Sequence, residues 1–198
     1  MRYTELLENL TDSIFSIQDL RIMGQKVIPA QFTSLAKSKQ IIRLKNGLYA
    51  IANKKNELTQ ENISFRLYQP SYLSLEWALH YHGLIPEIVY TPTSITTRNT
   101  RQIKNDFGLF VYRHIKKELF WGYTIQETGA RMFLLAEPEK ALLDYIYFNL
   151  AKIQSADDIE GLRLNPITLN SLNKEKLAKY AKIFDNKRIT KIVESLMK

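Results

Sequence analysis

The chain has 198 residues, of which 45% are apolar and 24% charged, and this composition excludes a disordered chain, a collagen-like protein and a coiled-coil rod. It contains no cysteine, which excludes a disulfide framework, a thiolate nucleophile and any cysteine-ligated metal site. The net charge of +8 favours an acidic partner, with nucleic acid as the first candidate.

The positive charges gather in three blocks that alternate with neutral or acidic segments. Residues 26–55 hold seven basic and no acidic side chains, residues 93–117 hold six and one, and residues 163–198 hold nine and three. A charge run is usually a solvated face, and this is the simplest interpretation of the last block. The first block coincides with a recognisable pattern of helices and strands, which favours a binding role.

Three short helices are predicted at the start of the chain. Residues 4–10 predict the first, and Ser16 as N-cap with Gly24 as terminator predicts the second over Ile17–Met23. Pro29 suits the first position of a third helix, because its φ is already fixed near the helical value.

The third predicted helix is amphipathic. Phe32, Leu35 and Ala36 fall on one face at helical spacing. The opposite face carries short hydroxyls and an ammonium group, which are side chains that contact phosphates and base edges in a major groove. These outward residues are Thr33, Ser34, Lys37 and Ser38.

A β-hairpin is predicted over residues 41–51, because Asn46-Gly47 between two β-favouring runs is a strong hairpin signal. With this turn, we expect Leu44 opposite Tyr49 and Ile42 opposite Ile51. These four side chains would pack on one face, and Arg43 and Lys45 would occupy the other.

Three helices followed by a basic hairpin predict a winged helix-turn-helix domain over residues 1–57. The third helix would read the groove of duplex DNA and the hairpin would lie along the adjacent backbone. The alternative is a small structural subdomain whose lysines only keep it soluble. The predicted DNA contacts are Thr33, Ser34, Lys37, Ser38, Lys39, Arg43, Lys45 and Asn46.

The rest of the chain predicts a second domain over residues 58–198, after a polar linker at 53–61. Its expected elements are a helix over Leu75–His82, strands near 88–97, 107–115, 119–125 and 131–135, a helix opening at Pro138, and two helices near the C-terminus. The predicted fold class is therefore α+β: an N-terminal winged helix-turn-helix and a second domain with a mainly antiparallel sheet and C-terminal helices.

Three segments in series carry a resemblance to a known family. They are Lys45-Asn46-Gly47-Leu48-Tyr49-Ala50-Ile51, then Tyr72-Leu73-Ser74-Leu75-Glu76-Trp77-Ala78-Leu79 with Gly83-Leu84-Ile85-Pro86-Glu87, and finally Ala136-Glu137-Pro138-Glu139-Lys140-Ala141-Leu142-Leu143-Asp144. In this order the chain resembles the AbiEi family of bacterial type IV antitoxins. The resemblance implies repression of the chain's own operon at its promoter. We expect the operator DNA to contain inverted repeats, because bacterial operators are commonly read by paired winged helices. The resemblance also implies neutralisation of a cognate nucleotidyltransferase-like toxin, directly or indirectly.

A second basic patch is predicted from the block at 93–117. It could extend the DNA contact, serve the antitoxin function, engage RNA or another acidic partner, or be only a solvated hairpin. Its members are Arg98, Arg101, Lys104, Arg113, Lys116 and Lys117.

The sequence offers little for catalysis, and we expect no enzyme activity, no metal and no cofactor. His80 and His82 lie two apart on a helix and point in different directions, and we expect His82 to be a boundary imidazole. His114 lies among lysines and could touch phosphate. With 7 glycines spread singly, no phosphate-binding loop is present.

Two alternative functions remain open at this point. One is a DNA-targeted, metal-dependent nuclease or transferase that uses Glu137, Glu139 and Asp144, although helix-dipole stabilisation already accounts for the first two. The other is a protein-interaction module. No apolar run approaches the roughly 18 residues of a membrane span and no signal segment opens the chain, so we expect a cytoplasmic protein without a membrane partner.

Overall fold

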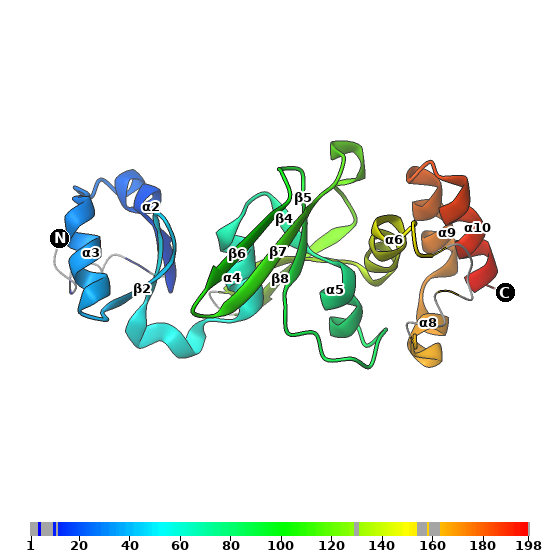
Figure 1. Cartoon of the computed structure of the whole chain (residues 1–198), viewed down its shortest axis with the longest axis horizontal. Helices are drawn as coiled ribbons and strands as arrows, with labels where there is room; N and C mark the ends of the chain where they lie inside the picture. Colours follow the sequence, from blue (N-terminus) through cyan, green and yellow to red (C-terminus); the bar gives the residue numbers. More distant parts are fainter. Residues whose placement is uncertain are drawn as a thin grey trace.

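A computed structural model of the chain describes residues 4, 10, 12–128, 131–153, 158 and 163–197. The fold is mixed α+β, and its parts follow one another along the longest axis of the molecule (Figure 1). Helices α2 (Ile17–Ile22) and α3 (Pro29–Lys37) lie with a small sheet at one end. A larger sheet lies in the middle, and the C-terminal helices lie at the other end. Among all the residues that the structure describes, no helix is long and apolar enough to cross a membrane.

Among the described residues, the N-terminal part contains helices α2 and α3 on a small antiparallel sheet, whose strand order is β1-β3-β2. The predictions of a helix after Ser16 and of another at Pro29 are confirmed. The helix predicted over 4–10 lies almost entirely outside the described residues. The elements are β1 (Ile14–Ser16), α2 (Ile17–Ile22), α3 (Pro29–Lys37), β2 (Ile41–Lys45) and β3 (Leu48–Ile51).

Local chemistry explains where α2 begins. The Ser16 hydroxyl accepts a hydrogen bond from the Asp19 amide at 3.0 Å, and the Asp19 carboxylate accepts one from the Ser16 amide at 2.8 Å. This reciprocal capping box satisfies two backbone donors that the first helical turn leaves free. Replacing such a cap typically costs about 1 kcal/mol.

The predicted register of the hairpin is wrong by one residue over most of β2. Lys45 pairs with Leu48 next to the turn, but Arg43 pairs with Tyr49 and Ile42 with Ala50. The irregularity lies between Arg43 and Lys45, where Leu44 is the extra residue of a bulge. Ile42 and Leu44 therefore face away from Tyr49, contrary to the prediction of one shared apolar face.

Both faces of the small sheet are covered, which explains why strict alternation gave the wrong register. Tyr49 and Ile51 pack with Phe32 of α3 in one apolar cluster. Leu44 and Leu48 pack in a second cluster against residues from the middle of the chain.

The segment predicted as a linker is mostly helical. A 3-10 helix, η1, covers Ala52–Glu57, and Thr59 is the N-cap of α4 (Gln60–Leu67). Ile63 and Leu67 of α4 are fully buried, in the same apolar cluster as Leu44. This cluster therefore joins the two parts of the chain on either side of residue 58.

The central sheet is mixed, with strand order β6-β7-β5-β4-β9-β8. β4 runs parallel to β9 and β5 parallel to β7, whereas the remaining neighbours are antiparallel. The predicted strands at 107–115 and 131–135 are confirmed, the strand at 88–97 is shorter, and the one at 119–125 begins later. The strands are β4 (Ser71–Leu73), β5 (Thr93–Thr96), β6 (Arg101–Asn105), β7 (Gly108–His114), β8 (Tyr123–Thr128) and β9 (Arg131–Ala136).

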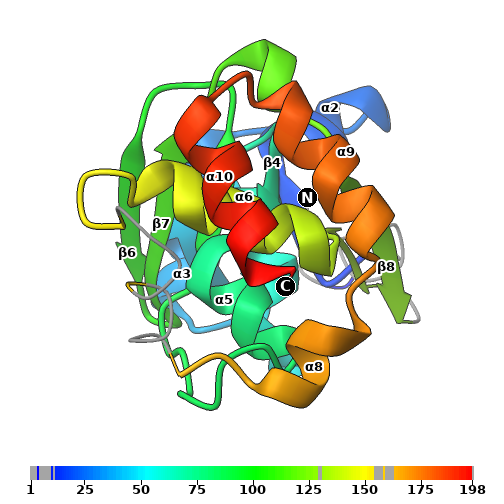
Figure 2. The same cartoon turned by 90° about the vertical axis from the view of Figure 1, so that its right-hand side faces the viewer.

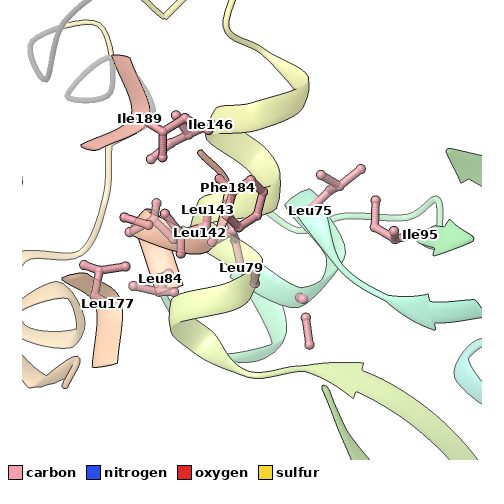
Figure 3. Close-up of a cluster of buried hydrophobic side chains, with 14 of the residues drawn as sticks. Leu75, Leu79, Leu84, Ile95, Leu142, Leu143, Ile146, Leu177, Phe184 and Ile189 are labelled. Carbon is pink, nitrogen blue, oxygen red and sulfur yellow. The ribbon is translucent and has the colours of Figure 1, made fainter. Parts of the chain in front are cut away.

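The largest apolar core lies between the central sheet and the helices at the C-terminal end. Figure 2 shows these helices facing the viewer. Leu142, Leu143 and Ile146 lie on α6, between residues of α5 and residues of the C-terminal helices (Figure 3). Each of these three side chains is fully buried, and burying a leucine or isoleucine contributes roughly 1.5–3 kcal/mol. Because it supplies all three, α6 is the central element of this core. The helices are α5 (Leu75–Tyr81), α6 (Pro138–Phe148), α8 (Pro166–Ser171), α9 (Lys174–Ile183) and α10 (Lys187–Leu196).

A buried ion pair lies inside this core. Lys140 and Asp144, one turn apart on α6, are both fully buried and form a hydrogen-bonded pair. Asp144 also accepts hydrogen bonds from the Tyr72 hydroxyl at 3.0 Å and the Ser74 hydroxyl at 2.8 Å. Burial lowers the pKa of Lys140 and raises the pKa of Asp144, and their mutual attraction opposes both shifts.

Aromatic rings and a glycine complete the surroundings of the lysine. The Lys140 ammonium lies 5.0 Å from the ring centroids of Trp121 and Phe184. Gly122 has a φ of +73°, and a Cβ there would lie 3.0 Å from the Lys140 Cγ. The glycine therefore both adopts the left-handed turn and leaves room for the lysine stem.

We expect Lys140→Met to destabilise the chain by about 3–5 kcal/mol near neutral pH, because it leaves the Asp144 carboxylate buried without its counter-ion. Asp144 would then have a folded-state pKa further above its unfolded value, so the loss should shrink as the pH falls through that folded-state pKa. Urea unfolding at several pH values, relative to the wild-type chain, measures this. Exposed Lys179→Met is the control, and a loss independent of pH would contradict the assignment.

Candidate nucleic-acid interface

The outward face of α3 is as the sequence predicts. Thr33, Ser34, Lys37 and Ser38 are exposed, while Phe32 on the opposite face is buried. The Ser38 hydroxyl donates to the Leu35 carbonyl at 3.1 Å, which partly occupies it. The remaining side chains of this face are exposed. The helix α3 itself lies at one end of the molecule (Figure 1).

Lys39 follows the C-cap Ser38 of α3 and has an unusual backbone conformation. Its φ is +57°, in the left-handed region, and the Gln40 amide donates to the Leu35 carbonyl at 3.0 Å, as in a Schellman motif. Glycine or asparagine usually fills this position. The lysine is exposed, so its ammonium is presented beside the end of the helix.

The two cations of the hairpin point in different directions. Arg43 is exposed and donates to the Asn46 side-chain oxygen at 3.2 Å. Lys45 is half-buried, and its ammonium donates to the Leu67 carbonyl of α4. The expectation that both lie on one outer face is therefore wrong, because the bulge at Leu44 separates them.

The first two basic blocks meet beside Lys45. We call Lys45, Arg66, Arg98 and Arg101 the junction cluster. Lys45 and Arg98 line one cleft of about 410 Å³ together with Arg66. Lys45 and Arg101 line a second cleft of about 480 Å³, to which Asn46 and Lys104 also contribute. Residues roughly fifty positions apart in the sequence thus form one surface.

Stacking and hydrogen bonds fix the arginines of the junction cluster. The Arg98 guanidinium lies 4.4 Å and the Arg101 guanidinium 5.7 Å from the Tyr68 ring centroid. Arg98 also donates to the Gln69 carbonyl at 3.1 Å. Cation–π contacts of this kind contribute about 0.5–1 kcal/mol at exposed sites, and here they orient both guanidinium groups.

The junction cluster carries more positive charge than its surroundings neutralise. Arg66 forms an ion pair with Asp19 at 2.7 Å, and its buried Nε has no hydrogen-bond partner. Burial, and then the neighbouring charges of Arg98, Arg101 and Arg66, lower the pKa of Lys45. In the described residues, Asp19 is the one carboxylate that pairs with this cluster. The arrangement favours an anion.

The remaining members of the second basic patch lie elsewhere. The Arg113 guanidinium stacks over Phe148 of α6 at 4.4 Å, on the face of the sheet opposite Tyr112. Lys116 and Lys117 are exposed at the turn after β7. The structure therefore brings Arg98, Arg101 and Lys104 to the hairpin, and not the other three.

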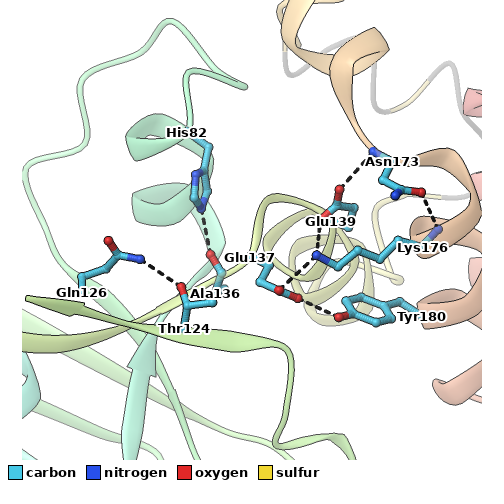
Figure 4. Close-up of polar contacts among 9 residues, drawn as sticks. All are labelled: His82, Thr124, Gln126, Ala136, Glu137, Glu139, Asn173, Lys176 and Tyr180. Carbon is cyan, nitrogen blue, oxygen red and sulfur yellow. Dashed lines mark hydrogen bonds and ion pairs between the residues drawn. The ribbon is translucent and has the colours of Figure 1, made fainter.

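The carboxylates proposed for a nuclease do not gather into a site. Glu137 accepts a hydrogen bond from Tyr180 at 2.7 Å and pairs with Lys176 at 3.0 Å, and Glu139 lies 3.4 Å from the same ammonium (Figure 4). Asp144 lies apart, in the buried pair. Within the described ranges, no group of three or more His, Asp or Glu residues is placed to hold a metal ion.

These contacts give the C-terminal helices a structural role. Burial alone would raise the pKa of Glu137, but hydrogen bonds from Tyr180 and Lys176 outweigh it and leave that pKa below its usual value. Glu139 also accepts from the Asn173 amide at 3.0 Å. The start of α6 therefore anchors α9 (Figure 4).

The histidines take ordinary positions. His82 contacts the Ala136 carbonyl at 2.8 Å through Nε2, as a boundary imidazole does (Figure 4). His114 is exposed, and its Nδ1 lies 3.0 Å from the Arg98 carbonyl. Its proximity to Arg98 keeps it near the junction cluster without giving it a catalytic partner.

Sequence reasoning missed Arg66 and Tyr68. Both come from α4 or its end, a helix that was not predicted because the segment before it is polar. The signal that could have found the helix is Thr59 as N-cap ahead of Ile63 and Leu67 at helical spacing.

Comparisons with known proteins do not add to this description. The chain matches no model of a known protein family, and no curated protein matches its sequence.

We expect phosphate to stabilise the chain against heat more than chloride does at equal ionic strength. An anion at the junction cluster relieves the repulsion around Lys45, and at 100 times its dissociation constant it would add about 2.7 kcal/mol. Because phosphate also stabilises proteins non-specifically, the comparison is with Arg98→Ala/Arg101→Ala, in which the extra stabilisation should vanish. Lys116→Ala/Lys117→Ala should retain it. An equal increment in all three proteins would contradict an anion site.

Proposed function

We propose that the chain binds duplex DNA, with its N-terminal part as a winged helix-turn-helix. The element order β1, α2, α3, β2, β3 supports this proposal, since α3 then follows α2 as the reading helix and β2–β3 forms the wing. The exposed hydroxyls of Thr33 and Ser34 are suited to base edges, and Lys37 and Lys39 to phosphates.

The observation that carries the proposal is the meeting of two basic blocks at the hairpin turn. Arg98 and Arg101 of the second block lie with Lys45 in the junction cluster, beside Asn46 of the turn. A DNA backbone that lies along the β2–β3 wing would come within reach of these arginines. Each phosphate that a cation neutralises releases counter-ions from DNA, which favours binding at low salt.

The resemblance to the AbiEi family extends the proposal to an antitoxin. On this basis the chain represses its own operon from inverted repeats and neutralises a nucleotidyltransferase-like toxin in the cytoplasm, without being an enzyme. Two of the segments that carry the resemblance meet in the core, where Tyr72 and Ser74 donate to Asp144. Their proximity supports their belonging to one structural unit.

Salt dependence tests DNA binding. Each phosphate contact contributes about 0.9 to the slope of log affinity against log salt, so Arg98→Ala/Arg101→Ala should flatten the slope by about 1.8. Arg43→Ala should flatten it by about 0.9, because Arg43 is exposed beside the turn. Fluorescence anisotropy with duplex DNA measures both, and Lys116→Ala/Lys117→Ala is the charge-matched control.

The same titration distinguishes recognition of DNA bases from contacts to the DNA backbone. Thr33→Ala/Ser34→Ala should reduce the preference for operator over random DNA by roughly 1–3 kcal/mol per lost base contact, and should leave the salt slope unchanged. If the wild-type chain shows no salt-dependent affinity for any duplex, the DNA-binding proposal fails. An equal loss of affinity for operator and random DNA would show that α3 does not recognise bases.

Growth rescue tests the antitoxin function in the full-length chain. We expect the wild-type chain and Thr33→Ala/Ser34→Ala to protect cells that express the neighbouring nucleotidyltransferase-like toxin, although the variant represses the promoter poorly. A fragment from residue 58 is unsuitable, because it would expose Ile63 and Leu67, which the hairpin covers. Absence of protection by the wild-type chain at matched soluble expression would overturn this function.

A further inference from the structure

A cleft of about 690 Å³ separates α3 and the hairpin from the turn between β6 and β7. One wall comes from the end of α3, from β2 and from η1. The other comes from Asp106 and Phe107 at the β6–β7 turn, which lies toward the N-terminal part of the molecule (Figure 1). Its volume falls within the roughly 300–1,000 Å³ of small-molecule sites, which occur preferentially between domains.

The cleft combines positive charge with apolar surface. Lys39, Arg43 and Lys55 line it against a single carboxylate, that of Asp106. In the described ranges, no ion pair joins any of these cations to a carboxylate. The remaining lining is apolar and consists of Ala36, Ile41, Ile42, Ala52 and Phe107.

Hydrogen bonds anchor the backbone of the turn that carries the aromatic wall. The Asn105 side-chain oxygen accepts from the Phe107 amide at 2.8 Å, and the Asn105 side-chain amide donates to the Leu44 carbonyl at 3.2 Å. Gln60 donates to the Phe107 carbonyl at 3.3 Å. The Lys55 ammonium lies 5.8 Å from the centre of the Phe107 ring. An aromatic ring on an anchored backbone, beside a cation, is a surface on which a flat ligand can stack.

Lys39 supplies one of the three cations at the rim of this cleft, because the capping conformation that follows α3 presents its exposed side chain there.

We propose that this cleft binds a phosphorylated small molecule with a flat apolar ring, of the nucleotide class. Lys39, Arg43 and Lys55 contact its phosphates. The base lies against Phe107 and the apolar floor, where Asp106 can accept hydrogen bonds from N–H groups of the base or from hydroxyl groups of the ribose.

The ligand also regulates DNA binding, and this part rests on the proposed function. Lys39 and Arg43 cannot contact a ligand phosphate and a DNA phosphate at once. A bound nucleotide therefore competes with two backbone contacts, and a saturating concentration should flatten the salt slope of DNA binding by about 1.8.

Isothermal titration calorimetry of the full-length chain with ATP, GTP and pyrophosphate tests the site. We expect ATP or GTP to bind at least tenfold more tightly than pyrophosphate, because only the nucleotides have a ring to stack. Lys55→Glu and Phe107→Ala should each weaken that binding about tenfold, which corresponds to about 1.4 kcal/mol. Lys54→Glu, the same charge change outside the cleft lining, should leave it within twofold.

DNA affinity measured without nucleotide separates the two proposals, since neither Lys55 nor Phe107 is a proposed DNA contact. No binding of ATP or GTP at millimolar concentration, with DNA binding intact, would overturn the nucleotide site alone. Binding that Lys55→Glu leaves unchanged, or equal affinity for pyrophosphate, would also overturn it. Because Lys55 is exposed, its substitution should not disturb folding.

Discussion

The apolar contact between the hairpin and α4 determines where the proposed binding residues lie. Leu44 and Leu48 pack with Ile63 and Leu67, so that the hairpin is attached to α4 through a shared apolar cluster. Because cores are closely packed, the hairpin and the central sheet are held together as one unit. The basic blocks of both parts then share a surface, and the clefts on either side of the contact acquire walls from both.

A second constraint operates at the other end of the molecule. α6 carries a fully buried ion pair in its middle and two carboxylates at its start, and each set of charges binds a different element. The inner pair contacts Tyr72 and Ser74 of the sheet region, and the outer carboxylates contact α9. Acidic residues that resemble a metal site in sequence therefore act as structural connections, which explains why the sequence alone could not assign them.

Local signals in the sequence predicted much of the fold, and tertiary packing accounts for what they missed. Pro29 and Pro138 correctly marked helix starts, because a proline acts at its own position. The bulge at Leu44 was not predictable, since burial on both faces of the sheet removes the alternation that sets register. β6 was missed because Arg101–Asn105 is a polar edge strand. Arg98 and Lys45 were both named as candidates, but only the folded chain brings them together.

The proposed anion binding at the junction cluster would also affect how long a copy of the chain survives. Burial and the neighbouring arginines lower the pKa of Lys45, and an anion bound beside it would offset the repulsion among these like charges. A ligand that binds the native state lowers the population of unfolded chains by mass action. Proteases that cleave transiently opened chains would therefore remove unoccupied copies first, and abundance in the cell would follow occupancy of the basic surface.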